Sequence, residues 1–133
     1  MKESYTLDTS AIMAYFLGEE GKDEVSRILS QAQKQEITVY VSFMSYMETL
    51  YRTWKLSDED TGRRAYIMLR NLPLKEVKQD EDLLLKAATM KATNPISVAD
   101  AWIAATAQKT GTTLVHKDPE MDVIKGIKFK KLS

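Results

Sequence analysis

The sequence contains no cysteine, which excludes disulfides, thiol catalysis and cysteine metal sites. It has a single histidine, His116, so a mechanism that needs two imidazoles is also excluded. A serine triad could use His116, but the chain has no Gly-x-Ser-x-Gly motif. Both common phosphate-binding loops, the Walker loop and Gly-x-Gly-x-x-Gly, are missing as well. Carboxylates are therefore the abundant side chains that remain for catalysis.

The sequence also lacks long hydrophobic runs and an excess of either charge. No run is long enough to span a bilayer, and the first ten residues lack the apolar core of a secretory signal. We therefore expect a cytoplasmic protein without a membrane partner. The 19 basic and 19 acidic residues cancel, which argues against binding nucleic acid by bulk electrostatics but leaves local phosphate contacts open. The 133 residues, 44% of them hydrophobic, suit a single domain over residues 1–133.

Stretches of β-favouring residues alternate with stretches of helical periodicity along the chain. The predicted strands cover residues 4–8, 37–42, 74–78, 112–117 and, as an edge strand, 127–132. The predicted helices cover residues 10–17, 22–35, 44–55, 57–72, 80–93 and 97–110. Thr9 or Ser10 is expected to cap the first helix, and Ser57 with Asp60 resembles a capping box for the fourth. This alternation predicts an α/β fold with a mostly parallel sheet.

Acidic residues occur where the predicted strands end. Asp8 and Asp118 each follow a strand, and Glu48 lies within two helical turns of another strand end. Sites in open α/β sheets form outside the carboxyl ends of the strands. Asp100 interrupts a nearly apolar helix, with no basic residue within one turn. Because burying an unpaired carboxylate costs several kcal/mol, a hard divalent cation with oxygen ligands would explain it.

Each acid also has a purely structural alternative. Asp8 and Asp118 are suitable as caps or turn residues, Asp100 can complete a capping box with Ser97, and Glu48 can be a surface residue. Taken singly these alternatives are common. The occurrence of all four acids in these contexts favours a metal site.

Four segments, in this order, resemble PIN-domain nucleases, and most closely the VapC-type toxins of toxin–antitoxin modules. They are LDTSAIMAYFLGEEG (7–21), VSFMSYMETLYR (41–52), ISVADAWIAATA (96–107) and TTLVHKDPEMD (112–122). The match runs from Tyr5 to Leu132. The resemblance implies a Rossmann-like three-layer sandwich, an acidic site that binds Mg²⁺ or Mn²⁺, and endoribonuclease activity. It also implies an RNA substrate, a small antitoxin as partner, and a homodimer.

By position, the resemblance makes Asp8, Glu48, Asp100 and Asp118 the catalytic, metal-binding acids, with Thr9 or Ser10 lining the same pocket. The chain departs from the family at two places. His116 stands where members often have Thr or Ser. A histidine there could contact the site or a phosphate, and the alternative that we favour is a strand-end residue without a chemical role. Glu120 and Met121 replace the end of an Asp-any-Asp-Phe pattern, and we expect Glu120 to be a solvated extra acid.

In the mechanism that we expect, Asp8, Asp100 and Asp118 bind the metal directly. Glu48 either binds it too or orients a water for in-line attack on phosphorus, which leaves a 5′-phosphate and a 3′-hydroxyl. Several basic residues are candidates for contacts with phosphate. They are Arg52, one turn beyond Glu48, then Lys117, Arg63, Arg64, Lys128, Lys130 and Lys131.

Two other functions remain open from the sequence. An α/β aspartyl-phosphate phosphatase also uses magnesium and acids at strand ends, but it would need an acid two residues after Asp8, where Ser10 stands. A non-catalytic protein-interaction module is the other. Its interface would be formed by aromatic and methionine residues for which core packing is the commoner explanation, namely Met44, Met47, Tyr51, Trp54, Tyr66 and Met68.

Overall fold

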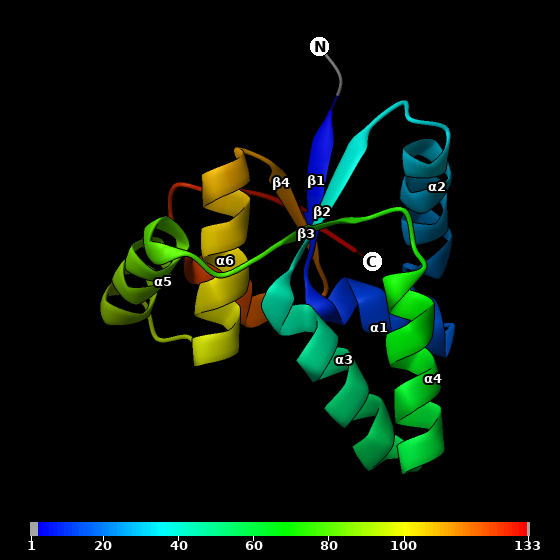
Figure 1. Ribbon diagram of the computed structural model, residues 1–133. Helices are drawn as coiled ribbons and strands as arrows, with labels where there is room; N and C mark the ends of the chain where they lie inside the picture. The colour runs from blue at the N-terminus through cyan, green and yellow to red at the C-terminus, as the bar shows by residue number, and fades with distance from the viewer. Residues whose placement is uncertain (1–2, 133) are drawn as a thin grey trace.

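A computed structural model describes residues 3–132 of the chain (Figure 1). Its strands are β1 (Ser4–Leu7), β2 (Thr38–Ser42), β3 (Lys75–Val77), β4 (Thr113–His116) and β5 (Lys128–Lys131). Its helices are α1 (Thr9–Leu17), α2 (Lys22–Gln33), α3 (Phe43–Leu56), α4 (Glu59–Arg70), α5 (Glu81–Thr93), α6 (Val98–Thr110) and the 3₁₀ helix η1 (Pro119–Val123). All predicted strands and α-helices are present with shifts of a few residues at their ends, whereas η1 was not predicted.

The strands form one five-stranded sheet in the order β3-β2-β1-β4-β5. Every pairing between neighbouring strands is parallel, so the predicted, mostly parallel sheet is confirmed and is parallel throughout. The tail strand β5 lies at one edge, as predicted. The chain builds β2 and β3 on one side of β1 and then crosses to place β4 on the other. The end of β1 therefore lies where the direction of winding reverses, the usual position of a site in such sheets.

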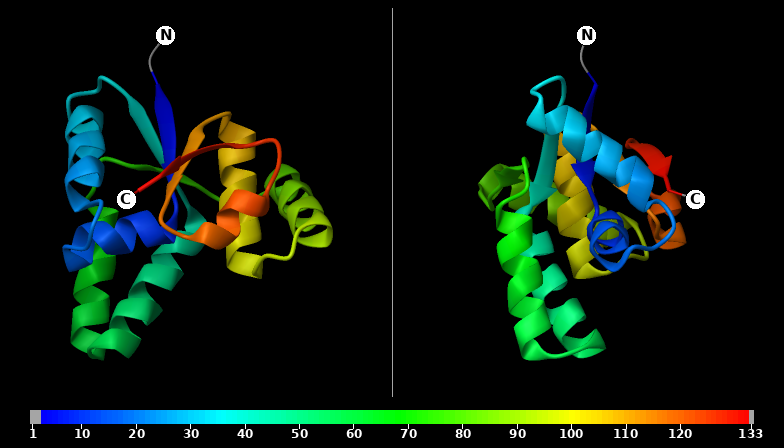
Figure 2. Two further views of the ribbon diagram at one scale, coloured as in Figure 1. Left: turned by 180° about the vertical axis from the view of Figure 1, so that it is seen from behind. Right: turned by 90° about the vertical axis from the view of Figure 1, so that its right-hand side faces the viewer.

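Helices cover both faces of the sheet, which confirms the three-layer α/β architecture (Figures 1 and 2). On one face, Leu7 and Val41 of the sheet pack with Ile12 of α1, Val25 of α2 and Leu69 of α4. The cluster on the other face joins residues of the sheet, α5, α6 and η1; among its members are Leu114, Met90, Ile103, Ala104 and Met121. In Figure 1, α3 and α4 form a pair that extends beyond the carboxyl ends of the strands.

The caps of two helices differ from those predicted. Asp58, not Ser57, caps α4, because its Oδ1 accepts the backbone N–H of Thr61 at 2.8 Å. Ser57 is already engaged as the last residue of the preceding turn, where its N–H bonds to Thr53 and Trp54 carbonyls. The predicted capping box of Ser57 with Asp60 is therefore wrong.

The first helix begins one residue earlier than predicted. Asp8 caps α1 through its side chain, and Thr9 and Ser10 lie inside the first turn. The other end follows the prediction, since Gly18 ends the helix in the left-handed conformation, with φ of 67°.

Within residues 3–132, no helix has the length and apolarity that crossing a membrane would require.

Candidate functional site

A pocket of about 270 Å³ opens at the carboxyl ends of β1 and β4, beside the first turns of α1 and α6 and the second and third turns of α3. The N–H of Asp8 donates to the Val115 carbonyl at 2.9 Å and joins the two strands at this point. All four acids chosen from the sequence line the pocket, together with two cations. The lining residues are Asp8, Thr9, Ser10, Glu48, Arg52, Asp100, Lys117, Asp118 and Pro119.

Asp8 is the most deeply buried of these acids, with 3% of its surface exposed. Its Oδ2 accepts hydrogen bonds from the N–H of Ser10, at 3.0 Å, and from the Ser10 hydroxyl. Ser10 in turn accepts the N–H of Lys117 at 2.9 Å, which links α1 to the segment after β4. The other oxygen, Oδ1, is buried without a hydrogen-bond partner in residues 3–132. Burial raises the pKa of Asp8, and the negative charge of Glu48 adds to this effect.

Glu48 approaches the pocket from the second turn of α3. It is 9% exposed, and its Oε1 accepts a hydrogen bond of 2.7 Å from the Thr9 hydroxyl. Burial raises the pKa of Glu48, while the hydrogen bond from Thr9 and the charge of Arg52 oppose the rise. The structural alternative of an ordinary surface residue does not fit this burial.

Asp100 lies in the first turn of α6 and is half-buried, less buried than the apolar helix suggested. Its N–H donates to Oγ of Ser97 at 3.1 Å, so the predicted cap at Ser97 is confirmed. Partial burial and the charges of Asp8 and Asp118 raise the pKa of Asp100 to about 6. The structural and the metal-binding explanations of Asp100 are therefore compatible, because its side chain remains available in the pocket.

Asp118 caps η1, with its Oδ1 accepting the N–H of Glu120 at 3.0 Å. The 3₁₀ turn that starts at Pro119 brings Glu120 back toward the acids. One carboxylate oxygen from each of Asp100, Asp118 and Glu120 lies within 4.8 Å of the other two. Glu120 is exposed, as expected, but it is also part of the acidic cluster. Only the pattern Asp-Pro-x-x at the end of a strand signalled this turn in the sequence.

His116 does not line the pocket. It is fully buried on the face of β4 that packs against Phe129, with ring centroids 5.2 Å apart. Its Nε2 lies 3.2 Å from Oδ1 of Asp122, in a geometry that does not form a hydrogen bond. This position agrees with the expected strand-end residue.

Most of the basic candidates are engaged elsewhere. Arg63 and Arg64 form ion pairs of 2.7 Å with acids one turn earlier on α4. Lys130 pairs with Glu24 at 2.8 Å, and Lys131 lies 3.5 Å from Asp122. Of the cations proposed from the sequence, only Arg52 and Lys117 line the acidic pocket.

Four aromatic and methionine residues of α3 and α4 are less buried than core packing would require. Met47, Tyr51, Trp54 and Met68 are between 42% and 59% exposed. For these four residues core packing is therefore the wrong explanation, and they form part of an apolar surface on the projecting helix pair.

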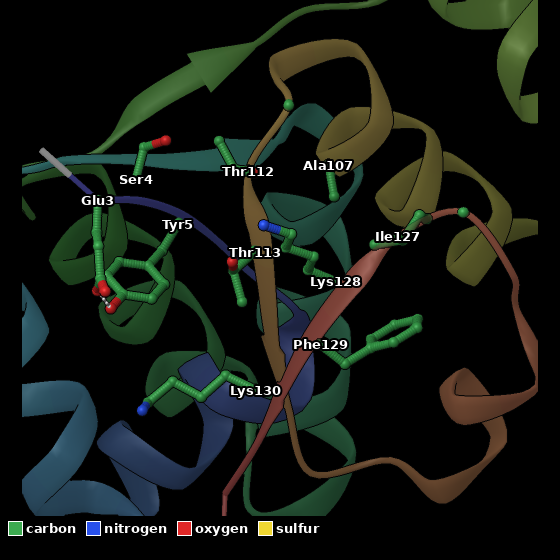
Figure 3. Close-up of a pocket in the computed structure, with 12 residues that line it drawn as sticks. Glu3, Ser4, Tyr5, Ala107, Thr112, Thr113, Ile127, Lys128, Phe129 and Lys130 are labelled. Carbon is green, nitrogen blue, oxygen red and sulfur yellow. Dashed lines mark hydrogen bonds between the residues drawn. The ribbon is translucent and has the colours of Figure 1, made fainter. Parts of the chain in front are cut away.

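A larger cavity, of about 650 Å³, lies at the opposite, amino ends of β1, β4 and β5 (Figure 3). Figure 3 shows Lys128 and Lys130 extending from β5, and the hydrogen bond between Glu3 and Tyr5. Its lining contains a single carboxylate, that of Glu3. This cavity therefore lacks the clustered acids that distinguish the smaller pocket.

The acidic pocket is suited to a hard divalent cation. Its candidate ligands are carboxylate oxygens, the type that Mg²⁺ and Mn²⁺ prefer. The unpartnered Oδ1 of Asp8 is a buried acceptor that a cation would satisfy, and the raised pKa values of Asp8, Glu48 and Asp100 show that these side chains are under-compensated as anions. The residues present thus fit such an ion.

Comparison with protein families gives a match to the PIN domain over residues 5–127. The chain belongs to the PIN domain family. Comparison with curated protein sequences finds no match.

Solved structures with this fold include several VapBC complexes. VapBC2 from Rickettsia felis, bound to a promoter DNA fragment, has a TM-score of 0.76 and 15% identity, covering 98% of this chain and 99% of that one. DNA-bound VapBC from Salmonella typhimurium has a TM-score of 0.73 and 19% identity, covering 98% of each chain. VapC20 from Mycobacterium tuberculosis, a toxin that cleaves the sarcin–ricin loop, has a TM-score of 0.73 and 15% identity, covering 92% of this chain and 96% of that one. These similarities extend the PIN fold over nearly the whole length of the chain.

Proposed function

We propose that this PIN domain is a metal-dependent endoribonuclease and the toxin of a toxin–antitoxin pair. The observation that carries the proposal is the buried, unpartnered Oδ1 of Asp8 in a pocket lined by three further carboxylates. A cluster of this kind needs a cation to offset its repulsion. The family, and the RNA-cleaving VapC20 with the same fold, support RNA as the substrate.

Each acid has a distinct part in this proposal. Asp8, Asp100 and Asp118 bind the cation, which when bound lowers the pKa of water and stabilises negative charge on a phosphoryl oxygen. Glu48, fixed by the hydroxyl of Thr9, orients the attacking water and accepts its proton. The water oxygen then bonds to phosphorus as the bond to the 3′ oxygen breaks. The departing 3′ oxygen takes up a proton from solvent, so the products carry a 5′-phosphate and a 3′-hydroxyl.

The biological setting is proposed from the structural relatives. The structural relatives include a toxin–antitoxin complex and a member of the VapBC family of toxin–antitoxin systems, so we propose a small antitoxin as partner for this chain. An arginine from such a partner would suit the acidic pocket, because its planar fork pairs with a carboxylate through two hydrogen bonds. We also propose a homodimer in the cytoplasm.

The activity is tested with purified protein and a labelled single-stranded RNA in Mn²⁺ or Mg²⁺. We expect endonucleolytic cleavage that stops when the metal is chelated. Asp8→Asn should be inactive but folded, and Asp23→Asn, which changes an exposed acid of α2, should cleave normally. Release of phosphate from a small phosphomonoester without RNA cleavage would instead favour the phosphatase. A folded protein with neither activity would favour the interaction module.

The toxin assignment needs a separate experiment in cells. Expression of this chain alone should arrest growth, and Asp8→Asn should relieve the arrest. Coexpression from the native operon should yield a complex with a small partner. If the wild-type chain is harmless but cleaves RNA, the nuclease assignment stands and the toxin assignment is wrong.

A further inference from the structure

Arg52 lies on α3 one helical turn after Glu48, so both side chains project from the same face of the helix. It is half-buried and forms part of the wall of the acidic pocket. Its positive charge acts on Glu48, since it lowers the pKa of that carboxyl group against the effect of burial. A guanidinium therefore stands beside the carboxylates that we assign to catalysis.

The other four arginines of the chain are all engaged in ion pairs. Their partners are Glu24 for Arg27, Glu59 for Arg63, Asp60 for Arg64 and Glu76 for Arg70, at distances from 2.7 to 3.4 Å. Arg52 alone forms no ion pair within 4.0 Å in the described part of the chain. Lys117, the second cation of the pocket, extends toward Glu19, with Nζ 3.9 Å from Oε1. Of the two cations that line the pocket, Arg52 is thus the one without an ion-pair partner in residues 3–132.

We propose that Arg52 binds a phosphate of the RNA strand at the mouth of the acidic pocket. This inference rests on the proposed nuclease function and names the residue that receives the substrate. An RNA phosphate is an anion that must approach four carboxylates, and a divalent cation offsets only part of their charge. The planar guanidinium of Arg52 can donate two parallel hydrogen bonds to the non-bridging oxygens and supply the missing positive charge.

A structural role for Arg52 predicts different behaviour. If the arginine only offset the charge of Glu48, its loss would alter metal binding and leave RNA affinity unchanged. Binding to phosphate instead makes RNA affinity depend on Arg52 and on salt. Each phosphate contact to a single strand contributes a slope of about 0.7 to the dependence of log K on log salt concentration.

The experiment compares Arg52→Gln, Arg52→Lys and Arg64→Gln with wild type. Arg64 is the matched control, an arginine of α4 whose guanidinium is already paired with Asp60. RNA affinity is measured by fluorescence anisotropy over a range of salt concentrations in Ca²⁺, and Mn²⁺ affinity by calorimetry. Cleavage in Mn²⁺ gives KM and kcat.

For Arg52→Gln we expect RNA affinity to fall about tenfold, with the salt slope smaller by about 0.7 and a matching rise in KM. Arg52→Lys should recover part of the affinity, because it restores the charge without the fork. Arg64→Gln should behave as wild type.

Unchanged RNA affinity and an unchanged salt slope in Arg52→Gln, with cleavage by the wild type intact, would overturn the role of Arg52 and leave the nuclease assignment standing. If the wild type binds RNA through Arg52 but never cleaves it, the nuclease assignment fails and the binding role remains. Absence of both RNA binding and cleavage in the wild type would overturn both.

Discussion

The hydroxyl of Thr9 donates a hydrogen bond of 2.7 Å to Oε1 of Glu48, across 39 residues of sequence. Thr9 lies in the first turn of α1 and Glu48 in the second turn of α3, so this bond joins the two elements that follow β1 and β2. It fixes the carboxylate to which we assign the orientation of water. The same hydrogen bond lowers the pKa of Glu48, whereas burial raises it.

Thr9→Val should therefore impair Glu48 without removing it. We expect cleavage to slow by about tenfold, within the usual range for acid–base catalysis, and the rising limb of the pH–rate profile to move to higher pH. The lost hydrogen bond should lower the free energy of unfolding by about 1 kcal/mol. Thr9→Ser keeps the hydroxyl and is the control. An unchanged pH profile in Thr9→Val would show that the bond does not tune Glu48.

The metal-free protein should lose stability as pH rises from about 4 to about 6. The pKa of Asp100 is about 6 in the folded state and about 3.9 in an unfolded chain, so the folded state binds more protons in this window. The stability that Asp100 contributes by binding a proton more tightly in the folded state is fully present below about pH 4. It is lost as the pH rises through about 6. Asp8 and Glu48, whose pKa values are also raised, act in the same direction.

Asp100→Asn should remove the part of this pH-dependent loss of stability that comes from Asp100. Because Asp100 is only half-buried, solvent screening reduces the effect, and we expect a gain on the order of 1 kcal/mol at pH 7.5 in chelator. Denaturant unfolding at pH 4.5 and 7.5 measures it. Equal stability of the variant and wild type at both pH values would show that Asp100 experiences no uncompensated charge.

Divalent metal should stabilise the folded protein, because an ion that binds only the folded state raises its stability by mass action. At a hundredfold excess over Kd we expect Mn²⁺ to raise the Tm by about 5–10 °C at pH 7.5, and by less at pH 5.5, where protons compete. Asp8→Asn should lose most of the response. Identical melting curves with and without Mn²⁺ in wild type would argue that the acids do not bind a metal.

Glu120 should contribute to metal binding although it is exposed. Its proximity to Asp100 and Asp118 leads us to expect that Glu120→Gln weakens Mn²⁺ binding several-fold in calorimetry, with little change in stability. Glu20→Gln, at an exposed acid outside the pocket, is the control. Wild-type Mn²⁺ affinity in Glu120→Gln would show that Glu120 is a solvated residue that does not contribute to metal binding.

The alternation of strands and helices could be predicted from sequence because β-branched stretches such as residues 37–42 differ clearly from stretches with apolar residues at helical spacing, such as residues 22–35. The convergence of Asp8, Glu48 and Asp118 on one pocket also follows, since parallel strands bring residues after their ends to one edge. Asp100 joins them because α6 runs back to the start of β4, so that its first turn lies at the same edge. The failures concern residues with two competing partners. The spacing of Ser57 to Asp60 predicts a cap for α4, but the backbone N–H of Ser57 already ends α3 and Asp58 caps α4 instead.

Other features of the site depend on three-dimensional detail that spacing does not carry. Glu120 reaches the acids only because Pro119 starts a 3₁₀ turn, and a 3₁₀ turn has no strong sequence periodicity. Which arginine lacks an ion pair cannot be read from spacing, because it depends on which acids the fold places beside each guanidinium. In the described part of the chain the other four arginines are paired and Arg52 is not. The exposure of Met47 and Trp54 likewise depends on how far α3 projects beyond the sheet.

The central claim is that the acidic pocket cleaves RNA with a bound divalent cation. Its most direct test is the cleavage rate of a labelled single-stranded RNA as Mn²⁺ is titrated, with Mn²⁺ binding measured by calorimetry on the same protein. We predict no cleavage in chelator, a rate that saturates with the same midpoint as binding, and a loss of at least about a hundredfold in Asp8→Asn. Cleavage in excess chelator, or wild-type rates in Asp8→Asn, would contradict the account.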